Sequence, residues 1–150
     1  LVRKVLDVEH TDLKAPVEAL GGKSLGETLL TPTRIYVKSI LALMEKVTIK
    51  SVSHITGGGF YENIPRSLPQ GMTAKIKEAD VPVLPIFDLI QAKGNIPRRE
   101  MFNTFNMGIG MTVVVAKEEA DQAMAALQAA GETPVRLGEI VPGDEGVILW

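Results

Sequence analysis

Hydrophobic residues recur at helical spacing most clearly between Tyr36 and Val47. The apolar positions in this segment are Val37, Ile40, Leu41, Met44 and Val47. Residues at this spacing share one face of a helix, and such a face is usually buried. Ser39 and Lys46 fall outside it. The pattern therefore predicts an amphipathic helix that packs on the chain through its apolar face.

The rest of the chain alternates between helical and strand periodicity. Further helices are predicted over residues 1–6, 15–20, 86–93 and 118–130, with a short one ending near Phe105, and strands over residues 50–56, 72–76, 111–116, 135–141 and 147–150. The run at 111–116 is rich in β-branched residues, which is typical of a buried central strand. Helices that alternate with strands predict an α/β (α+β) fold with a single mixed sheet covered by helices.

The composition fits one compact domain spanning residues 1–150. A chain of 150 residues can bury a core, and 45% hydrophobic with 23% charged residues is ordinary for globular proteins. The net charge of −2 gives no electrostatic basis for binding nucleic acid or an anionic membrane. The absence of cysteine excludes a thiolate metal site and a cysteine nucleophile, and it fits a reducing cytoplasm.

The opening segment carries a separate indication. The chain begins on Leu1 within a pattern that predicts the interior of an amphipathic helix. Natural ends and processing sites favour exposed, flexible segments over helical ones. We therefore expect further residues upstream of Leu1, and the alternative is a processed mature protein.

The most distinctive stretch runs from Ser53 to Arg66. A predicted strand reaches His54 and Thr56, breaks on Gly57-Gly58-Gly59, and gives way to a predicted helix that carries Asn63. Consecutive glycines cost conformational entropy unless the backbone needs positive φ or a close approach. A strand, a glycine turn and a helix start together gather free backbone N–H groups, which often hold phosphate. A tight turn with close helix packing explains the glycines equally well, so both interpretations stay open.

Side chains around this turn also have two interpretations each. His54 could be a hydrogen-bond donor or a general acid/base near neutral pH, or a structural histidine bonded to a carbonyl. Arg66 could reach an anion held by the turn, or lie in solvent. A second stretch leads from Asn106 through Gly108 and Gly110 into the strand at 111–116. Its glycines could let backbone approach a ligand, or mark a bulge.

Two standard nucleotide-binding motifs are excluded. A P-loop requires Gly-Lys-Ser/Thr five residues after its first glycine, and none of the three consecutive glycines is followed in that way. A dinucleotide fingerprint that begins at Gly108 would need a small residue where Val113 stands, and it would have to follow a strand rather than precede one. Two histidines far apart in sequence do not predict a zinc site.

Three segments taken together resemble one enzyme family. The first is Leu30-Thr31-Pro32-Thr33-Arg34-Ile35-Tyr36-Val37-Lys38-Ser39. The second runs from His54 to Arg66. The third runs from Glu100 to Met111 and contains Thr-Phe-Asn-Met-Gly-Ile-Gly-Met. In this order they closely resemble phosphoribosylformylglycinamidine cyclo-ligase, also called aminoimidazole ribonucleotide (AIR) synthetase. The resemblance covers essentially the whole chain and corresponds to the C-terminal half of that enzyme.

The resemblance implies a cytoplasmic, homodimeric enzyme of purine biosynthesis that uses ATP and Mg²⁺. ATP activates the formamide oxygen of formylglycinamidine ribonucleotide, a nitrogen of the amidine side attacks, and AIR, ADP and phosphate leave. An N-terminal domain absent from this chain would supply the dimer contacts, most nucleotide contacts and the metal-binding acids. No metal ligand is therefore assigned in this chain, no cofactor is expected to bind it tightly, and the chain alone is expected to be inactive.

The resemblance also implies which residues form one wall of the cleft between the two halves. His54 is the candidate catalytic residue. The candidate substrate- and phosphate-binding residues are Thr56, Gly57, Gly58, Gly59, Asn63, Arg66, Asn106, Gly108 and Gly110. A phosphate needs several fixed donors and no intruding Cβ, which backbone amides of glycine provide.

Two alternatives remain beside this interpretation. Selenophosphate synthetase, thiamine monophosphate kinase and formylglycinamidine ribonucleotide synthetase share the architecture and also activate a substrate with ATP. The His-Ile-Thr-Gly-Gly-Gly string favours the cyclo-ligase over them. A non-catalytic phosphate-binding domain is the alternative from a different class, and it would describe the isolated chain.

Overall fold

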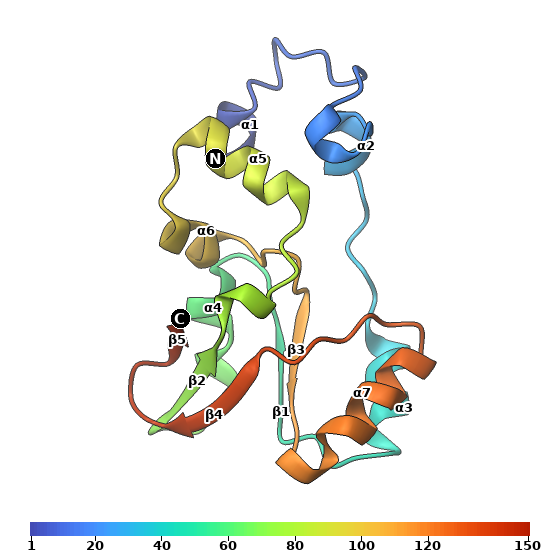
Figure 1. The fold of residues 1–150 in the computed structure, drawn as a ribbon, viewed down its shortest axis with the longest axis vertical. Coiled ribbons are helices and arrows are strands. Elements are labelled where there is room, and N and C mark those ends of the chain that lie inside the picture. Colours follow the sequence, from blue (N-terminus) through green and yellow to red (C-terminus); the bar gives the residue numbers. More distant parts are fainter.

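The computed structural model describes all 150 residues as an elongated arrangement of short helices and two small sheets (Figure 1). The α-helices are α1 (Val2–Val5), α2 (Leu25–Leu29), α3 (Val37–Met44), α4 (Gly59–Asn63), α5 (Pro85–Gly94), α6 (Arg98–Thr104) and α7 (Ala120–Ala129). The strands are β1 (Ser51–His54), β2 (Met72–Ile76), β3 (Met111–Val114), β4 (Gly138–Pro142) and β5 (Val147–Leu149). Four short 3₁₀ turns complete it: η1 (Glu18–Leu20), η2 (Pro65–Ser67), η3 (Glu78–Asp80) and η4 (Lys117–Glu119).

The mixture of helices and strands confirms the α/β class, but the single mixed sheet is wrong. β1 and β3 form an antiparallel two-stranded sheet, with Ser51 opposite Val114 and His54 opposite Met111. The second sheet has the order β4-β2-β5, in which β2 is antiparallel to β4 and parallel to β5. β4 and β5 form the two edges of this sheet, and neither pairs with β1 or β3, so the strands do not join into one sheet.

β3 is not the buried central strand that its β-branched sequence predicts. All four of its residues are half-buried, and β1 is its only strand neighbour. α3 and α7 supply apolar cover through a small cluster of Leu43, Val47 and Ala123, against which Val113 and Val115 pack. The β-branched residues of β3 are therefore partly covered by helices, and β3 has no second strand beside it.

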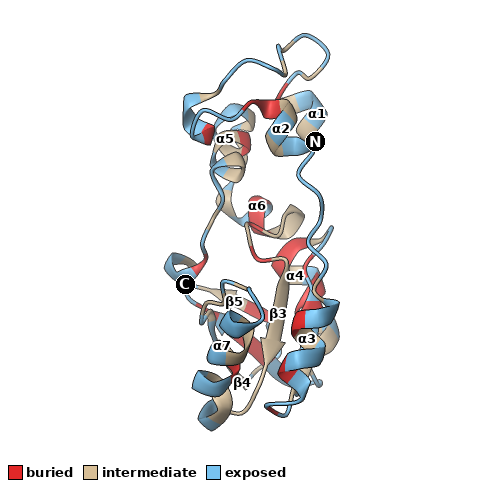
Figure 2. Cartoon of the chain, turned by 90° about the vertical axis from the view of Figure 1, so that its right-hand side faces the viewer, coloured by how far each residue is buried: buried red, intermediate tan, exposed pale blue.

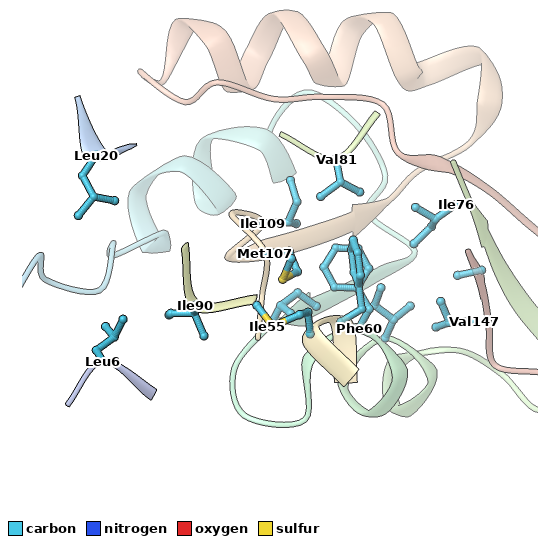
Figure 3. Packing of buried hydrophobic residues seen from close by; sticks show 14 of the residues in the cluster. Leu6, Leu20, Ile55, Phe60, Ile76, Val81, Ile90, Met107, Ile109 and Val147 are labelled. Atoms are coloured by element: carbon cyan, nitrogen blue, oxygen red, sulfur yellow. The ribbon is translucent and has the colours of Figure 1, made fainter. Parts of the chain in front are cut away.

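The main core lies between α4, α6 and the three-stranded sheet, and extends to α1 and α5 (Figure 3). Phe60 and Phe102 are completely buried, and their rings meet edge to face at 5.2 Å. Edge-to-face pairs of this kind add about 0.5–1.5 kcal/mol to the free energy of burying the rings. The pair fixes α4 against α6, and with it the segment that leads into α4.

Segment 15–20 is not the predicted helix. Only η1 is helical there, and Pro16 instead forms an isolated bridge with Ser24. The helix that follows, α2, begins at a capping box in which Ser24 Oγ accepts from the Glu27 N–H and Glu27 Oε2 accepts from the Ser24 N–H. A proline at the first turn is compatible with a helix, but here Pro16 pairs with Ser24, and the next α-helix begins only after that serine.

α3 forms where the periodicity predicts it, but only part of the predicted apolar face is buried. Ser39, Leu43 and Val47 are buried, whereas Leu41 and Met44 of the predicted apolar face are 57% and 60% exposed. The buried side is fixed by α7, because Leu43 packs with Ala123 and Ser39 Oγ donates to Glu132 Oε1 at 2.5 Å. Figure 2 shows buried and exposed residues together along α3.

Candidate functional site

The glycine stretch forms the connection from β1 to α4, and two of its glycines are required by the backbone itself. Gly58 and Gly59 have φ of +94° and +54°, a region that residues with a Cβ rarely adopt. A Cβ on Gly59 would also lie 2.0 Å from the carbonyl oxygen of Phe102. Gly59 therefore allows α4 to approach α6, and these two glycines need no ligand to explain them.

Gly57 is different from its two neighbours. Its φ is not positive, and a Cβ built on it would have no atom within 4 Å. Neither folding nor packing therefore requires glycine at this position. A glycine that the fold does not need is a candidate for close approach of a ligand to the backbone.

Asn63 supports the turn from inside the protein. Its side chain is only 9% exposed, and Nδ2 donates to the carbonyl oxygens of Gly59 at 2.7 Å, Gly57 at 3.2 Å and Thr56 at 3.4 Å. The amide therefore has no donor left for a ligand. We assign Asn63 to holding the turn and not to contacting a substrate.

The turn presents donors as well as carbonyls. The backbone N–H groups of Gly57, Gly58 and Tyr61 have no acceptor within the chain, and these three residues are at least partly exposed, whereas Phe60 is completely buried. Because Asn63 binds the carbonyls of the same turn, these N–H groups are the hydrogen-bonding groups that remain free. Groups of this kind can donate hydrogen bonds to an oxyanion.

One pocket, of about 210 Å³, adjoins this turn. Its lining residues are Thr56, Gly57, Phe87, Thr104, Phe105 and Asn106. The pocket thus brings the glycine stretch together with the stretch around Asn106, which lies about fifty residues later in the sequence. Phe87 and Phe105 form an apolar wall, with ring centroids 5.5 Å apart.

The remaining sides of this pocket are lined by polar, uncharged residues. Thr56, Thr104 and Asn106 can supply hydroxyl and amide groups, although Asn106 Oδ1 already accepts from the Gly108 N–H at 3.0 Å. No lysine, arginine, aspartate or glutamate lines the pocket. It can therefore bind phosphate oxygens through hydrogen bonds, but it offers neither a balancing cation nor carboxylate ligands for Mg²⁺.

The remaining predicted site residues lie outside the pocket. Arg66 is bound to Glu62 across 3.0 Å, and both side chains are exposed. Gly108 has φ of +106°, and a Cβ on it would lie 2.5 Å from the carbonyl oxygen of Pro82. The conformation and packing of Gly108 therefore have a structural cause.

Gly110 has a different neighbour, which links the three sequence segments of the resemblance. A Cβ on Gly110 would lie 2.0 Å from Tyr36 Oη, so glycine makes room for the tyrosine. The Tyr36 ring also meets the ring of His54 edge to face at 6.1 Å. Residues from the first, second and third segments are thus in contact at Tyr36, which the sequence did not single out.

His54 ends β1, and its side chain is exposed. It does not line the pocket, but it lies two residues before Thr56, which does. Its neighbour Tyr36 is partly buried, and burial raises the pKa of the Tyr36 phenol; the negative charge of Glu132 adds to this and Arg34 opposes it. The phenol therefore stays protonated at neutral pH and can act as a hydrogen-bond donor.

Substitution of Gly110 by alanine tests the contact with Tyr36. We expect a destabilisation of about 1–3 kcal/mol, as is typical of overpacking, because the methyl group displaces the phenol. The measurement is urea unfolding of Gly110→Ala in the natural background and in Tyr36→Ala. In the second background the penalty should fall below about 0.5 kcal/mol, and an equal penalty in both would show that the phenol is not the obstacle.

Two further findings concern metal ions and membranes. It contains no group of three or more histidine, aspartate or glutamate side chains arranged to hold a metal ion. None of its helices has both the length and the apolar character needed to cross a membrane.

Comparison with known proteins gives consistent results. The chain is 50% identical over 150 residues to a phosphoribosylformylglycinamidine cyclo-ligase of Lachnoclostridium phytofermentans and 52% identical over 149 residues to that of Brevibacillus brevis. These matches cover 99% of this chain but only 44% and 43% of those proteins. The chain thus spans less than half the length of the curated relatives that it matches.

A solved structure supports the fold alone. The crystal structure of Escherichia coli HypE matches with a TM-score of 0.62 and 22% sequence identity, over 83% of this chain and 40% of that one. All residues from 1 to 150 match the family described as "AIR synthase related protein, C-terminal domain". The similarity predicted from three short segments is therefore confirmed over the whole chain, which belongs to the AIR synthase related C-terminal domain family.

Proposed function

We propose that this chain is the C-terminal part of a longer protein, the parent, which is an ATP-dependent phosphoribosylformylglycinamidine cyclo-ligase. In the parent it forms one wall of the site where formylglycinamidine ribonucleotide is closed to AIR. Relatives of about 50% identity with that name, matched along 99% of the chain, support the proposal. They also favour the cyclo-ligase over the related synthetases and the kinase.

The observation that carries the proposal is the convergence of two distant segments on one pocket. Thr56 and Gly57 come from the β1–α4 connection, and Asn106 comes from the segment before β3. These are the two segments in which the sequence places candidate phosphate-binding residues. Free N–H groups of the turn and the Thr56 hydroxyl would hold phosphate oxygens, either of the ribonucleotide or of the phosphoryl group in transfer.

The pocket is incomplete for phosphoryl transfer on its own. Such reactions develop charge on the phosphoryl oxygens, which cations normally stabilise. This pocket has no cationic side chain, and the chain has no acidic cluster for Mg²⁺. The parent's N-terminal domain would supply ATP and Mg²⁺ binding and the homodimer contacts. A cytoplasmic location belongs to the same proposal.

A steady-state assay tests the proposed activity. The parent, given formylglycinamidine ribonucleotide, ATP and Mg²⁺, should form AIR, and the 150-residue chain alone should not. Absence of AIR formation by the parent would overturn the assignment of activity. AIR formation by the 150-residue chain alone would overturn its role as one wall of an incomplete site, and would leave the binding-domain alternative without support.

Replacement of His54 separates a functional histidine from a structural one. His54→Ala in the parent should lower kcat by about 10²-fold or more, the lower range for loss of a general acid or base. Because the side chain is exposed, we expect the free energy of unfolding to change by less than about 0.5 kcal/mol. A large fall in melting temperature with a proportionate fall in folded enzyme would instead identify a structural histidine.

A further inference from the structure

The surface of α3 carries an apolar stripe that no part of the chain covers. Val37, Leu41 and Met44 are 62%, 57% and 60% exposed, and Ile35, just before the helix, is 82% exposed. We call these four residues the α3 stripe. Its helical members are spaced four and three residues apart, so they lie on one side of α3 in consecutive turns.

This exposure is not the ordinary scatter of single apolar residues on a surface. An isolated exposed leucine needs no explanation, but the largest contiguous apolar patch of a protein is often an interaction surface. Another side of α3 is already packed, since Leu43, together with Val47 just after the helix, forms a buried cluster with Ala123 of α7. α3 is therefore apolar on two sides, and the fold of this chain uses one of them.

Two residues of the α3 stripe flank Tyr36, which contacts the region of the candidate site. Tyr36 lies between Ile35 and Val37 in the sequence, and its ring contacts His54 while its hydroxyl lies at Gly110.

We propose that the α3 stripe is the surface on which the remainder of the parent polypeptide docks. This inference rests on the proposed function, in which the parent is longer than this chain. The relatives named cyclo-ligase indicate that this remainder would be more than half of the parent, because the matched region is only 43–44% of their length.

Interface size favours a segment of the same polypeptide over a second copy of this chain. Two separate proteins that associate stably bury about 800 Å² on each partner. Four exposed side chains offer only a few hundred Å². Interfaces between domains of one polypeptide bury about 600–1,500 Å², and covalent linkage removes much of the cost of their association. The α3 stripe fits the smaller requirement.

Thiol labelling tests the proposal directly, because the chain contains no cysteine of its own. Leu41→Cys and Met44→Cys place a thiol on the stripe. Ala42→Cys is the matched control, since Ala42 is exposed on the same helix but points away from the stripe. Each variant is made in the 150-residue chain and in the parent, and maleimide labelling is followed by peptide mass spectrometry at the engineered position.

We expect the stripe cysteines to label at least tenfold more slowly in the parent than in the 150-residue chain. The Ala42→Cys rate should agree between the two within about twofold. Equal rates at the stripe in both proteins would overturn the proposal. Protection that appears in the 150-residue chain alone, and that grows with its concentration, would overturn it in favour of a second copy. AIR formation by the same parent preparations reports separately on the proposed function.

Discussion

Gly59→Ala is expected to destabilise the chain by about 2–5 kcal/mol. A residue with a Cβ at φ of +54° costs about 1–2 kcal/mol, and overpacking typically costs a further 1–3 kcal/mol. The obstacle is backbone, since the new Cβ would lie 2.0 Å from the Phe102 carbonyl oxygen and 2.9 Å from that of Phe105. α4 would have to move away from α6 and take the Phe60–Phe102 contact with it. Urea unfolding measures the loss.

Gly57→Ala is the matched control for this prediction. It adds the same methyl group two residues away, where no atom lies within 4 Å and φ is not positive. We expect its free energy of unfolding to stay within about 0.5 kcal/mol of the natural chain. Equal destabilisation by the two substitutions would contradict the division of the three glycines into two structural ones and one that is free.

Asn63→Leu is the second substitution with a large expected effect. The side chain has similar size but no donor, so the carbonyl oxygens of Thr56, Gly57 and Gly59 lose a shared partner. Each hydrogen bond lost costs about 0.5–1.5 kcal/mol, and this substitution removes three together. We therefore expect a loss of about 2–4 kcal/mol, and faster amide exchange in the turn, measured by urea unfolding and hydrogen exchange.

Asn103→Leu provides the comparison for Asn63. Asn103 is half-buried in α6 and makes no side-chain hydrogen bond, so its replacement should cost less than about 1 kcal/mol. If Asn63→Leu were no more harmful than Asn103→Leu, the amide would not hold the turn. The binding role that the sequence suggests for Asn63 would then be open again.

Element types in this chain could largely be predicted from periodicity, because it reports which residues share a face. The helix at Pro85–Gly94 ends at Asn95 in the left-handed conformation, and β2 occupies the predicted residues. What periodicity does not contain is the partner of each face. β3 has the composition of a central strand, yet it has one neighbour, and strand order is set by contacts between segments far apart in sequence.

α3 shows the same limit more sharply. The five apolar positions read from the sequence include both the packed Val47 and the exposed Leu41, because the helix has apolar residues on two sides. Ser39 is buried through its bond to Glu132, ninety-three positions later in the chain. A single helix can therefore be predicted in place and length while its orientation depends on residues that no local pattern includes.

For the candidate site, the sequence predicted the segments but not the role of each residue. Thr56, Gly57 and Asn106 meet at the pocket, as the phosphate-binding interpretation requires. Asn63 and Gly108 lie in the same segments, but buried hydrogen bonds and close backbone packing account for them. Phe87 and Tyr36 were not singled out, since an aromatic residue carries no local sign that it will form a wall or a contact between segments.

The central claim is that the pocket beside Gly57 binds the reacting ligand in the parent. kcat/KM of the Gly57→Ala parent tests it most directly, because this substitution is the one in the glycine turn that the fold tolerates. We predict a fall of at least about tenfold, equivalent to about 1.4 kcal/mol of transition-state stabilisation, with an unchanged melting temperature. An unchanged kcat/KM in the folded Gly57→Ala parent would contradict the claim.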